Sequence, residues 1–267
     1  MKYLINISLI LFFAVMFSCR SSKDLIFLKD AANNEIIKGL STEYILKPGD
    51  ILYVSIKSMS PEVNSLFNPE SGMESGSGSG SGSSSGYGFT RYTSPSGAYL
   101  YGFELDTEGN IKLPIIGKVR VSDETLTRAE LIVQKRADEF LKDAIVKVKL
   151  LNFKVTVTGE VRNPGTYYNY NNSITVIEAL AMASGNTDFA SIKKIMVVRR
   201  FPGGNKSYLL DLSKKNIYLS EAFYLQPNDY VIVQPDRYKN FQLNSQAYSL
   251  IFSSMSILLA VLGFVLK

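Results

Sequence analysis

The chain has 267 residues, no histidine and a single cysteine. Ser-His-Asp and Cys-His catalysis and almost all zinc or haem sites need His or several Cys, so this composition excludes those two kinds of catalysis and almost all zinc or haem sites. Paired carboxylates could still hydrolyse a glycosidic bond, but the sequence carries no signature of such a pair. A hydrophobic content of 46% indicates a folded protein, and a net charge of +5 without a run of Lys or Arg argues against nucleic acid. We expect no catalytic residue, metal or cofactor.

The chain begins with a hydrophobic leader. An apolar stretch from Leu4 to Phe17 follows a positive charge and ends at Ser18 and the only cysteine, Cys19. This order predicts a signal peptide over residues 1–18. An unpaired cysteine at this place resembles a bacterial lipobox, so we expect Cys19 to be lipidated and to begin a tether over residues 19–43. The alternative is an incidental cysteine in an uncleaved anchor helix.

The first ordered unit is predicted to open with a turn at Pro48-Gly49-Asp50 that leads into an alternating strand. A Ser/Gly-rich run over residues 68–97 follows, and such a composition cannot build a packed element. Because strands resume after it, an insertion within one domain is favoured over an interdomain linker. A helix from about Thr127 to Leu141, with Thr127 and Glu130 as a capping box, and a further strand complete an α+β unit.

A second unit is predicted after residue 151. It starts with two strands joined by an Asn-Pro-Gly turn at residues 163–165. A helix follows in which Ile177, Leu180 and Ala181 share one face, and Gly185 ends it. Further short strands close the unit.

The last strand of the second unit repeats the first strand of the chain. LKPGDILYV and LQPNDYVIV share Leu, Pro and Asp in register. The same turn leading into a strand is therefore predicted at both places. We expect Asp50 and Asp229 to anchor these turns and not to act as acids.

Two ordered sets of motifs resemble the outer-membrane polysaccharide export proteins of capsule and exopolysaccharide systems. The export-domain patterns Y-x-L-x-P-G-D-x-L-x-V and D-x-x-G-x-I-x-L-P-x-I-G-x-V begin at Tyr44 and Asp106. The β-grasp patterns V-x-G-x-V-x-x-P-G-x-Y and A-L-x-x-A-x-G begin at Val157 and Ala179. The Ser/Gly insertion departs from the family pattern, as does a single β-grasp domain where longer members have two.

The resemblance implies an α+β fold with a polysaccharide export domain over residues 44–151 and a soluble ligand-binding β-grasp domain over residues 152–236. It also implies a homo-oligomeric ring, with polysaccharide, membrane lipid and an inner-membrane polysaccharide co-polymerase or chain-length regulator as partners. The protein would then lie in the outer membrane, held by its lipid, with its body in the periplasm.

The C-terminal residues carry neither charge nor proline from Tyr248 to Leu266. As a helix this run would reach about 29 Å, so we predict a transmembrane helix over residues 248–266. Small residues recur along one side of it at steps of four and three: Ser249, Ser253, Ser256, Ala260 and Gly263. In lipid this small-residue stripe suits a seam between helices or a mildly polar pore wall, and the alternative is an ordinary anchor with incidental serines.

The hypothesis that we favour is an oligomeric channel for capsular or extracellular polysaccharide, without covalent chemistry and therefore not an enzyme. Tyr167, Tyr168 and Tyr170, which adjoin several Asn residues, are candidate glycan contacts, although such a cluster is also typical of a plain turn. The alternative function is a periplasmic glycan-binding or scaffolding lipoprotein whose terminal helix is only an anchor. A carbohydrate-active enzyme is disfavoured by the missing histidine.

Overall fold

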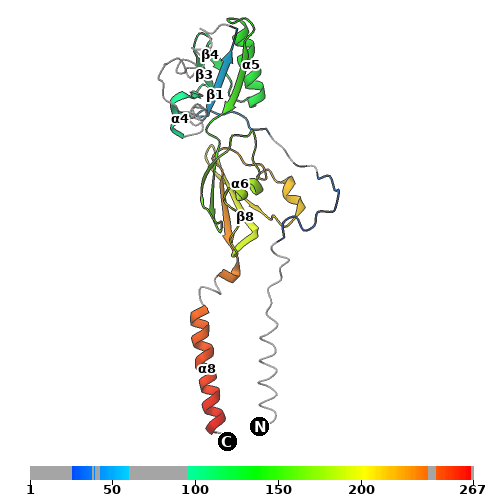
Figure 1. Cartoon of the computed structure of the whole chain (residues 1–267), viewed down its shortest axis with the longest axis vertical. Helices are drawn as coiled ribbons and strands as arrows, with labels where there is room; N and C mark the ends of the chain where they lie inside the picture. The colour runs from blue at the N-terminus through cyan, green and yellow to red at the C-terminus, as the bar shows by residue number, and fades with distance from the viewer. Residues whose placement is uncertain (1–25, 38, 40–42, 60–94, 240–244, 266–267) are drawn as a thin grey trace, which may run out of the picture.

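The computed structural model describes residues 26–37, 39, 43–59, 95–239 and 245–265. They form two mixed units of strands and helices, followed by a separate C-terminal helix (Figure 1). This confirms the α+β class. The predicted signal peptide, Cys19 and most of the Ser/Gly insertion lie outside the described residues.

The first unit contains a three-stranded antiparallel sheet in the order β2-β1-β5. Its strands are β1 (Ile51–Lys57), β2 (Phe103–Glu104) and β5 (Ile145–Leu150), and a hairpin of β3 (Asn110–Leu113) and β4 (Gly117–Arg120) packs beside it. Alternation along β1 and β5 buries Leu52, Val54, Val146 and Val148 on one face, as the period of a strand requires. A short helix that was not predicted, α4 (Pro95–Tyr101), precedes β2.

Helix α5 (Leu126–Asp138) packs against β5 through Ala129, Val133 and Ala137, which are fully buried. The predicted cap was wrong, because Thr125 and not Thr127 caps this helix and accepts a hydrogen bond from the amide of Arg128 at 3.2 Å.

The Glu130 carboxylate is used elsewhere. It accepts a hydrogen bond from the amide of Val148 at 2.9 Å, while the Gln134 side chain accepts one from Val146 at 2.9 Å. Strand β5 is at the edge of its sheet, so helix α5 satisfies donors that would otherwise be left without a strand partner.

The second unit is a five-stranded mixed sheet in the order β7-β6-β10-β8-β9. Its strands are β6 (Lys154–Gly159), β7 (Gly165–Tyr168), β8 (Ala190–Phe201), β9 (Gly204–Leu210) and β10 (Tyr230–Pro235). Strands β6 and β10 are parallel, and all other neighbours are antiparallel. A short 3-10 helix, η3 (Lys215–Leu219), precedes β10.

Helix α6 (Val176–Met182) covers one face of this sheet and is held by a capping box of Thr175 and Glu178 (Figure 1). The predicted helix is confirmed, but its buried face consists of Val176, Ala179 and Leu180, whereas Ala181 is exposed. The helix ends where Gly185 takes a φ of +79° and donates its amide to the carbonyl of Leu180 at 2.8 Å.

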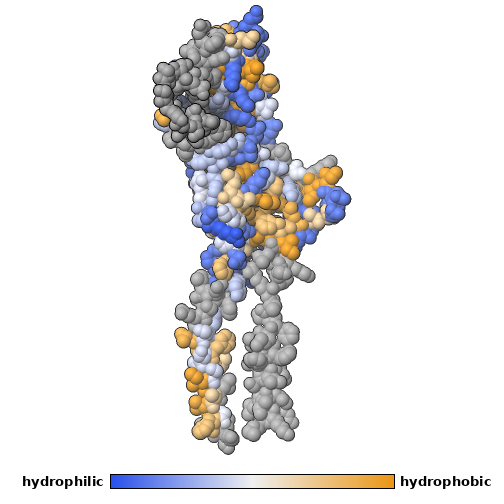
Figure 2. All heavy atoms as spheres, viewed as in Figure 1, coloured by the Kyte–Doolittle hydropathy of each residue, from blue (hydrophilic) through white to orange (hydrophobic). Residues whose placement is uncertain are grey.

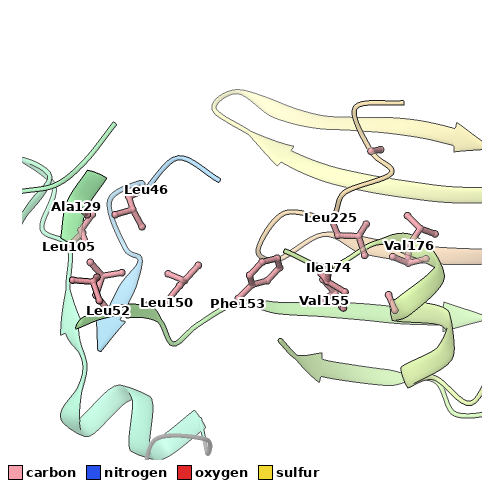
Figure 3. Close-up of a cluster of buried hydrophobic side chains, with 14 of the residues drawn as sticks. Leu46, Leu52, Leu105, Ala129, Leu150, Phe153, Val155, Ile174, Val176 and Leu225 are labelled. Atoms are coloured by element: carbon pink, nitrogen blue, oxygen red, sulfur yellow. The ribbon is translucent and has the colours of Figure 1, made fainter. Parts of the chain in front are cut away.

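The hydrophobic core continues from one unit to the next. Figure 3 shows Leu52 and Leu150 on one side of the junction, Val155 and Ile174 on the other, and Phe153 between them. Phe153 is only 2% exposed. The linker between the two sheets is therefore itself part of the core.

The N-terminal segment contacts the second unit, although the first unit follows it in sequence. The amides of Leu28 and Lys29 donate to the carbonyls of Leu212 and Ser213 at 2.9 and 3.0 Å. Lys215 pairs with Glu35, with 2.6 Å between Nζ and Oε1. The tether residues that the structure describes are thus fixed to the second unit.

The C-terminal helix α8 (Ser245–Val265) forms where a helix was predicted. Within the described part of the chain, however, no helix is long and apolar enough to cross a membrane. The structure therefore confirms a helix in this region, but the prediction that residues 248–266 cross the membrane was wrong.

Candidate functional site

Both predicted turns use an aspartate in the same way. The Asp50 carboxylate accepts a hydrogen bond from the amide of Lys47 at 2.8 Å, and the Asp229 carboxylate accepts one from Gln226, also three residues earlier, at 2.8 Å. The residue before each aspartate has a positive φ, +88° at Gly49 and +66° at Asn228. The predicted repetition of one turn before a strand is thereby confirmed.

Asp50 is buried beside a tyrosine. Its carboxylate accepts a hydrogen bond from the Tyr44 hydroxyl at 3.0 Å, and only 5% of the residue is exposed. Burial raises the pKa of Asp50 above its ordinary value, although the bonds from Lys47 and Tyr44 oppose the shift. Such a carboxylate supports a turn, and nothing around it in the described structure suggests proton transfer to a substrate.

Asp229 is paired with a cation that the sequence analysis did not single out. Arg199 on β8 donates from Nε and Nη2 to this carboxylate, the closest distance being 2.8 Å between Nη2 and Oδ2. The same guanidinium donates to the carbonyls of Glu221 and Tyr224. Arg199 therefore ties the loop before β10 to the middle of the sheet.

The three candidate tyrosines do not point the same way. Tyr167 lies opposite Val155, packs against the core and donates its hydroxyl to the carbonyl of Asn163, so it supports the fold. Tyr168 lies opposite Lys154 on the other face of the sheet. Tyr170 is 49% exposed in the loop after β7, and burial together with the Tyr168 phenol raises its pKa. The structure thus groups Tyr168 with Tyr170 and separates Tyr167 from both.

The face of the five-stranded sheet opposite α6, here called the open face, consists of half-buried and exposed side chains. It carries the side chains that alternate with the buried ones. They are Lys154, Thr156 and Thr158 on β6, Thr166 and Tyr168 on β7, Lys194, Met196, Val198 and Arg200 on β8, Asn205, Ser207 and Leu209 on β9, and Tyr230, Ile232 and Gln234 on β10. Tyr230 is 45% exposed and was missed by the sequence analysis, although its place at the start of an alternating strand was a usable signal.

Lys239 anchors the end of the second unit just before the terminal helix. It forms an ion pair with Glu160, and the hydroxyl of Thr187 donates to the same carboxylate at 2.7 Å. These partners lower the pKa of Glu160 below its ordinary value. The last described residues before α8 are therefore fixed to the sheet.

The small-residue stripe of α8 is helical as predicted, and its serines bond to their own helix. The hydroxyl of Ser253 donates to the carbonyl of Ser249 at 2.7 Å, and that of Ser256 donates to Ser253 at 2.8 Å. Around the stripe, apolar side chains are exposed, among them Leu250 at 70% and Phe264 at 85%. Figure 2 shows the resulting hydrophobic surface of α8.

No group of three or more His, Cys, Asp or Glu side chains is arranged for a metal ion in the part of the chain that the structure describes. The buried carboxylates found there, Asp50, Glu160 and Asp229, support two turns and two ion pairs.

Two family models match consecutive parts of the chain. Residues 39–151, which contain the first unit, match the polysaccharide biosynthesis/export protein family. Residues 153–233, which contain the second unit, match the SLBB domain. The chain belongs to the polysaccharide export protein family. The boundary between the two matches falls at the buried linker around Phe153.

Curated relatives agree with this assignment. The chain is 29% identical over 115 residues to the EPS I polysaccharide export outer membrane protein EpsA of Ralstonia nicotianae (strain ATCC BAA-1114 / GMI1000). It is 28% identical over 115 residues to the EpsA of Ralstonia solanacearum. Each alignment covers 42% of this chain and 29% of the relative, so it spans under a third of the relatives' length.

Proposed function

We propose that this protein is an outer-membrane lipoprotein that forms an oligomeric channel for capsular or extracellular polysaccharide and does no covalent chemistry on it. The observation that carries the proposal is the succession of an export domain and an SLBB domain on one continuous core. The two relatives are named as export proteins of the outer membrane, which supports the same location here.

The exposed helix α8 supports an assembly. A helix with apolar side chains exposed around it, such as Ile257 and Phe264, needs a partner to remove that surface from water. Because Ser253 and Ser256 already donate to their own helix, the small-residue stripe can approach a neighbouring helix without losing hydrogen bonds. We therefore favour a seam between the α8 helices of several copies over a polar pore wall.

The two chain ends of the described structure support a common attachment. Residues 26–37 are fixed to the β-grasp unit, and Lys239 fixes the start of the segment that leads to α8 to the same unit. In the proposal, lipidation at Cys19 holds this side of the body at the membrane, and the rest lies in the periplasm, where an inner-membrane co-polymerase or chain-length regulator would meet it.

Extraction and deletion test this function together. The full chain, extracted from membranes in mild detergent, is expected to show the mass of an oligomer, and a deletion strain is expected to lose its surface polysaccharide. A monomer, together with undiminished surface polysaccharide, would overturn the proposal. A Cys19→Ala variant is expected to lose acyl chains by mass spectrometry and to leave the membrane fraction.

A further inference from the structure

The open face of the SLBB sheet combines aromatic rings with hydroxyl groups. Tyr230 lies beside Thr156 on the parallel neighbour β6, and Thr156 lies opposite Thr166, with 3.1 Å between their hydroxyl oxygens. Tyr168 lies two residues further along β7, opposite Lys154. From the strand register, the two tyrosines lie about 12 Å apart across the flat sheet. Sugar rings stack on aromatic faces and bond to hydroxyls, and this spacing suits a short run of linked sugars.

The charge of this sheet has one sign. Its strands hold no Asp or Glu and six basic residues, namely Lys154, Lys193, Lys194, Arg199, Arg200 and Lys206. On the covered side, Arg199 is neutralised by Asp229, and Lys206 pairs with Glu221.

The open-face cations have no such partner. Lys154, Lys194 and Arg200 all lie on the open face, and none of them forms an ion pair with any residue that the structure describes. A ligand that carries negative charge would therefore find cations whose charge no described carboxylate neutralises.

We propose that the open face is a binding site for an acidic polysaccharide, with Tyr168 and Tyr230 as stacking platforms and Lys154 and Arg200 as partners of its carboxylates. The site rests on the proposed export function for the polymeric nature of its ligand. It adds to that function the charge of the polymer and the face that it contacts.

Apolar residues on β10, β8 and β9, on the side of Tyr230 away from Tyr168, fit the same ligand. Met196 and Ile232 are opposite each other and half-buried, and Leu209, opposite Met196, is 66% exposed. Carbon-bound hydrogens of a sugar ring pack on such a surface while its hydroxyl groups reach the threonines at the side. A purely ionic site would not need this apolar strip.

Binding of alginate oligosaccharides to the purified full chain in detergent tests the proposal. Calorimetry should give clear binding of alginate, which carries a carboxylate on every sugar, and much weaker binding of neutral dextran oligosaccharides. The double variant Tyr168→Ala/Tyr230→Ala is expected to lose about tenfold in affinity for alginate, since each stacking contact is modest. The double variant Lys154→Ala/Arg200→Ala should bind alginate more weakly, and its affinity for alginate should depend less on salt concentration.

Matched controls separate this face from the general surface. Tyr99→Ala removes a tyrosine of α4 that is 78% exposed, and Lys112→Ala removes an exposed lysine of β3. Neither change should alter alginate affinity. Poly-glutamate, an acidic polymer without sugar rings, should bind the tyrosine double variant as well as it binds the unchanged protein.

The outcomes are distinct. Equal affinity of the tyrosine double variant and the unchanged protein for alginate would overturn the site, and so would dextran binding as tight as alginate binding. A change in assembly mass without a change in affinity would also overturn it and assign the face to contact between copies. Loss of surface polysaccharide in the deletion strain, with normal export by all face variants, would overturn this inference and leave the export function intact.

Discussion

Arg199 and Asp229 form the most deeply buried ion pair among the described residues, with 6% and 1% of their side chains exposed. Burying two charges is costly, and the pair is tolerated because the guanidinium also donates to two carbonyls while the carboxylate accepts a backbone amide. The contribution of the pair is therefore best seen when one partner is removed.

We expect Arg199→Ala to lower the free energy of unfolding by about 3–5 kcal/mol, since it leaves Asp229 buried and unpaired. The measurement is urea unfolding followed by circular dichroism. Arg200→Ala, which removes the exposed neighbour on β8, is the matched control and should change the free energy of unfolding by less than about 0.5 kcal/mol. Equal losses in the two variants would show that the pair does not stabilise the sheet.

Glu160 makes the stability of the folded protein depend on pH in a known direction. Lys239 and Thr187 lower its pKa in the folded state below the ordinary 4.5, so its stabilising contribution is complete above that pH. The contribution is lost as the pH falls from 4.5 through the folded value. We expect Glu160→Gln to cost about 1 kcal/mol at pH 7 and to cost progressively less below pH 4.5. A cost that stays constant down to pH 3 would contradict this.

At the scale of single residues, sequence patterns predicted the contacts that form between residues close together in the sequence. Asp50 and Asp229 were predicted as turn anchors because the amides that they accept from lie three residues away. Arg199 was not predicted, because its carboxylate lies 30 residues further along the chain. Tyr167 and Tyr168 could not be separated until the register of β6 and β7 fixed which of them faces the core.

Among the elements, β6 depends on a glycine at its end. Gly159 has a φ of +89°, and a Cβ at this position would lie 2.1 Å from the carbonyl oxygen of Val233 on the parallel strand β10. Gly203, in the β8–β9 hairpin, has a nearly equal φ of +91° but nothing within 4 Å. The two glycines thus separate the effect of backbone conformation from the effect of close strand approach.

We expect Gly203→Ala to cost about 1 kcal/mol through its positive φ, and Gly159→Ala to cost about 3 kcal/mol because the strands must also move apart. The difference in urea unfolding midpoint between the two variants measures how much stability the close approach of the strands at Gly159 contributes. If both variants lose the same stability, the neighbouring strand does not require a glycine at residue 159.

The sequence predicted where the helices lie better than it predicted their caps and their buried faces. The α5 and α6 helices were found where apolar periodicity placed them, but the cap of α5 was assigned two residues late, because Glu130 bonds to β5 instead of its own helix start. The α6 face was displaced because burial against the sheet selects Val176 and Ala179, which a helical wheel alone ranks no higher than Ala181. Local propensity could not include these tertiary contacts.

Across the whole molecule, the contacts that join distant segments were beyond the sequence patterns. The pairing of Leu28 with Leu212 and of Glu35 with Lys215 brings the start of the described chain to the unit that precedes α8. Nothing in a tether composition predicts its docking surface. These contacts hold the start of the described chain at the second unit, from which α8 extends (Figure 1).

The small-residue stripe is the proposed contact between the α8 helices of neighbouring copies. We expect the triple variant Ser253→Leu/Ser256→Leu/Gly263→Leu to separate the helices, since bulky side chains prevent the close approach that small ones allow. Its assembly mass in mild detergent should fall to that of a monomer, and surface polysaccharide should be lost. The control variant Ile251→Leu/Met255→Leu/Val261→Leu changes exposed apolar positions between the stripe residues and should keep both. If the triple variant retains both the oligomer and export, the contacts between copies must lie in the export and SLBB units.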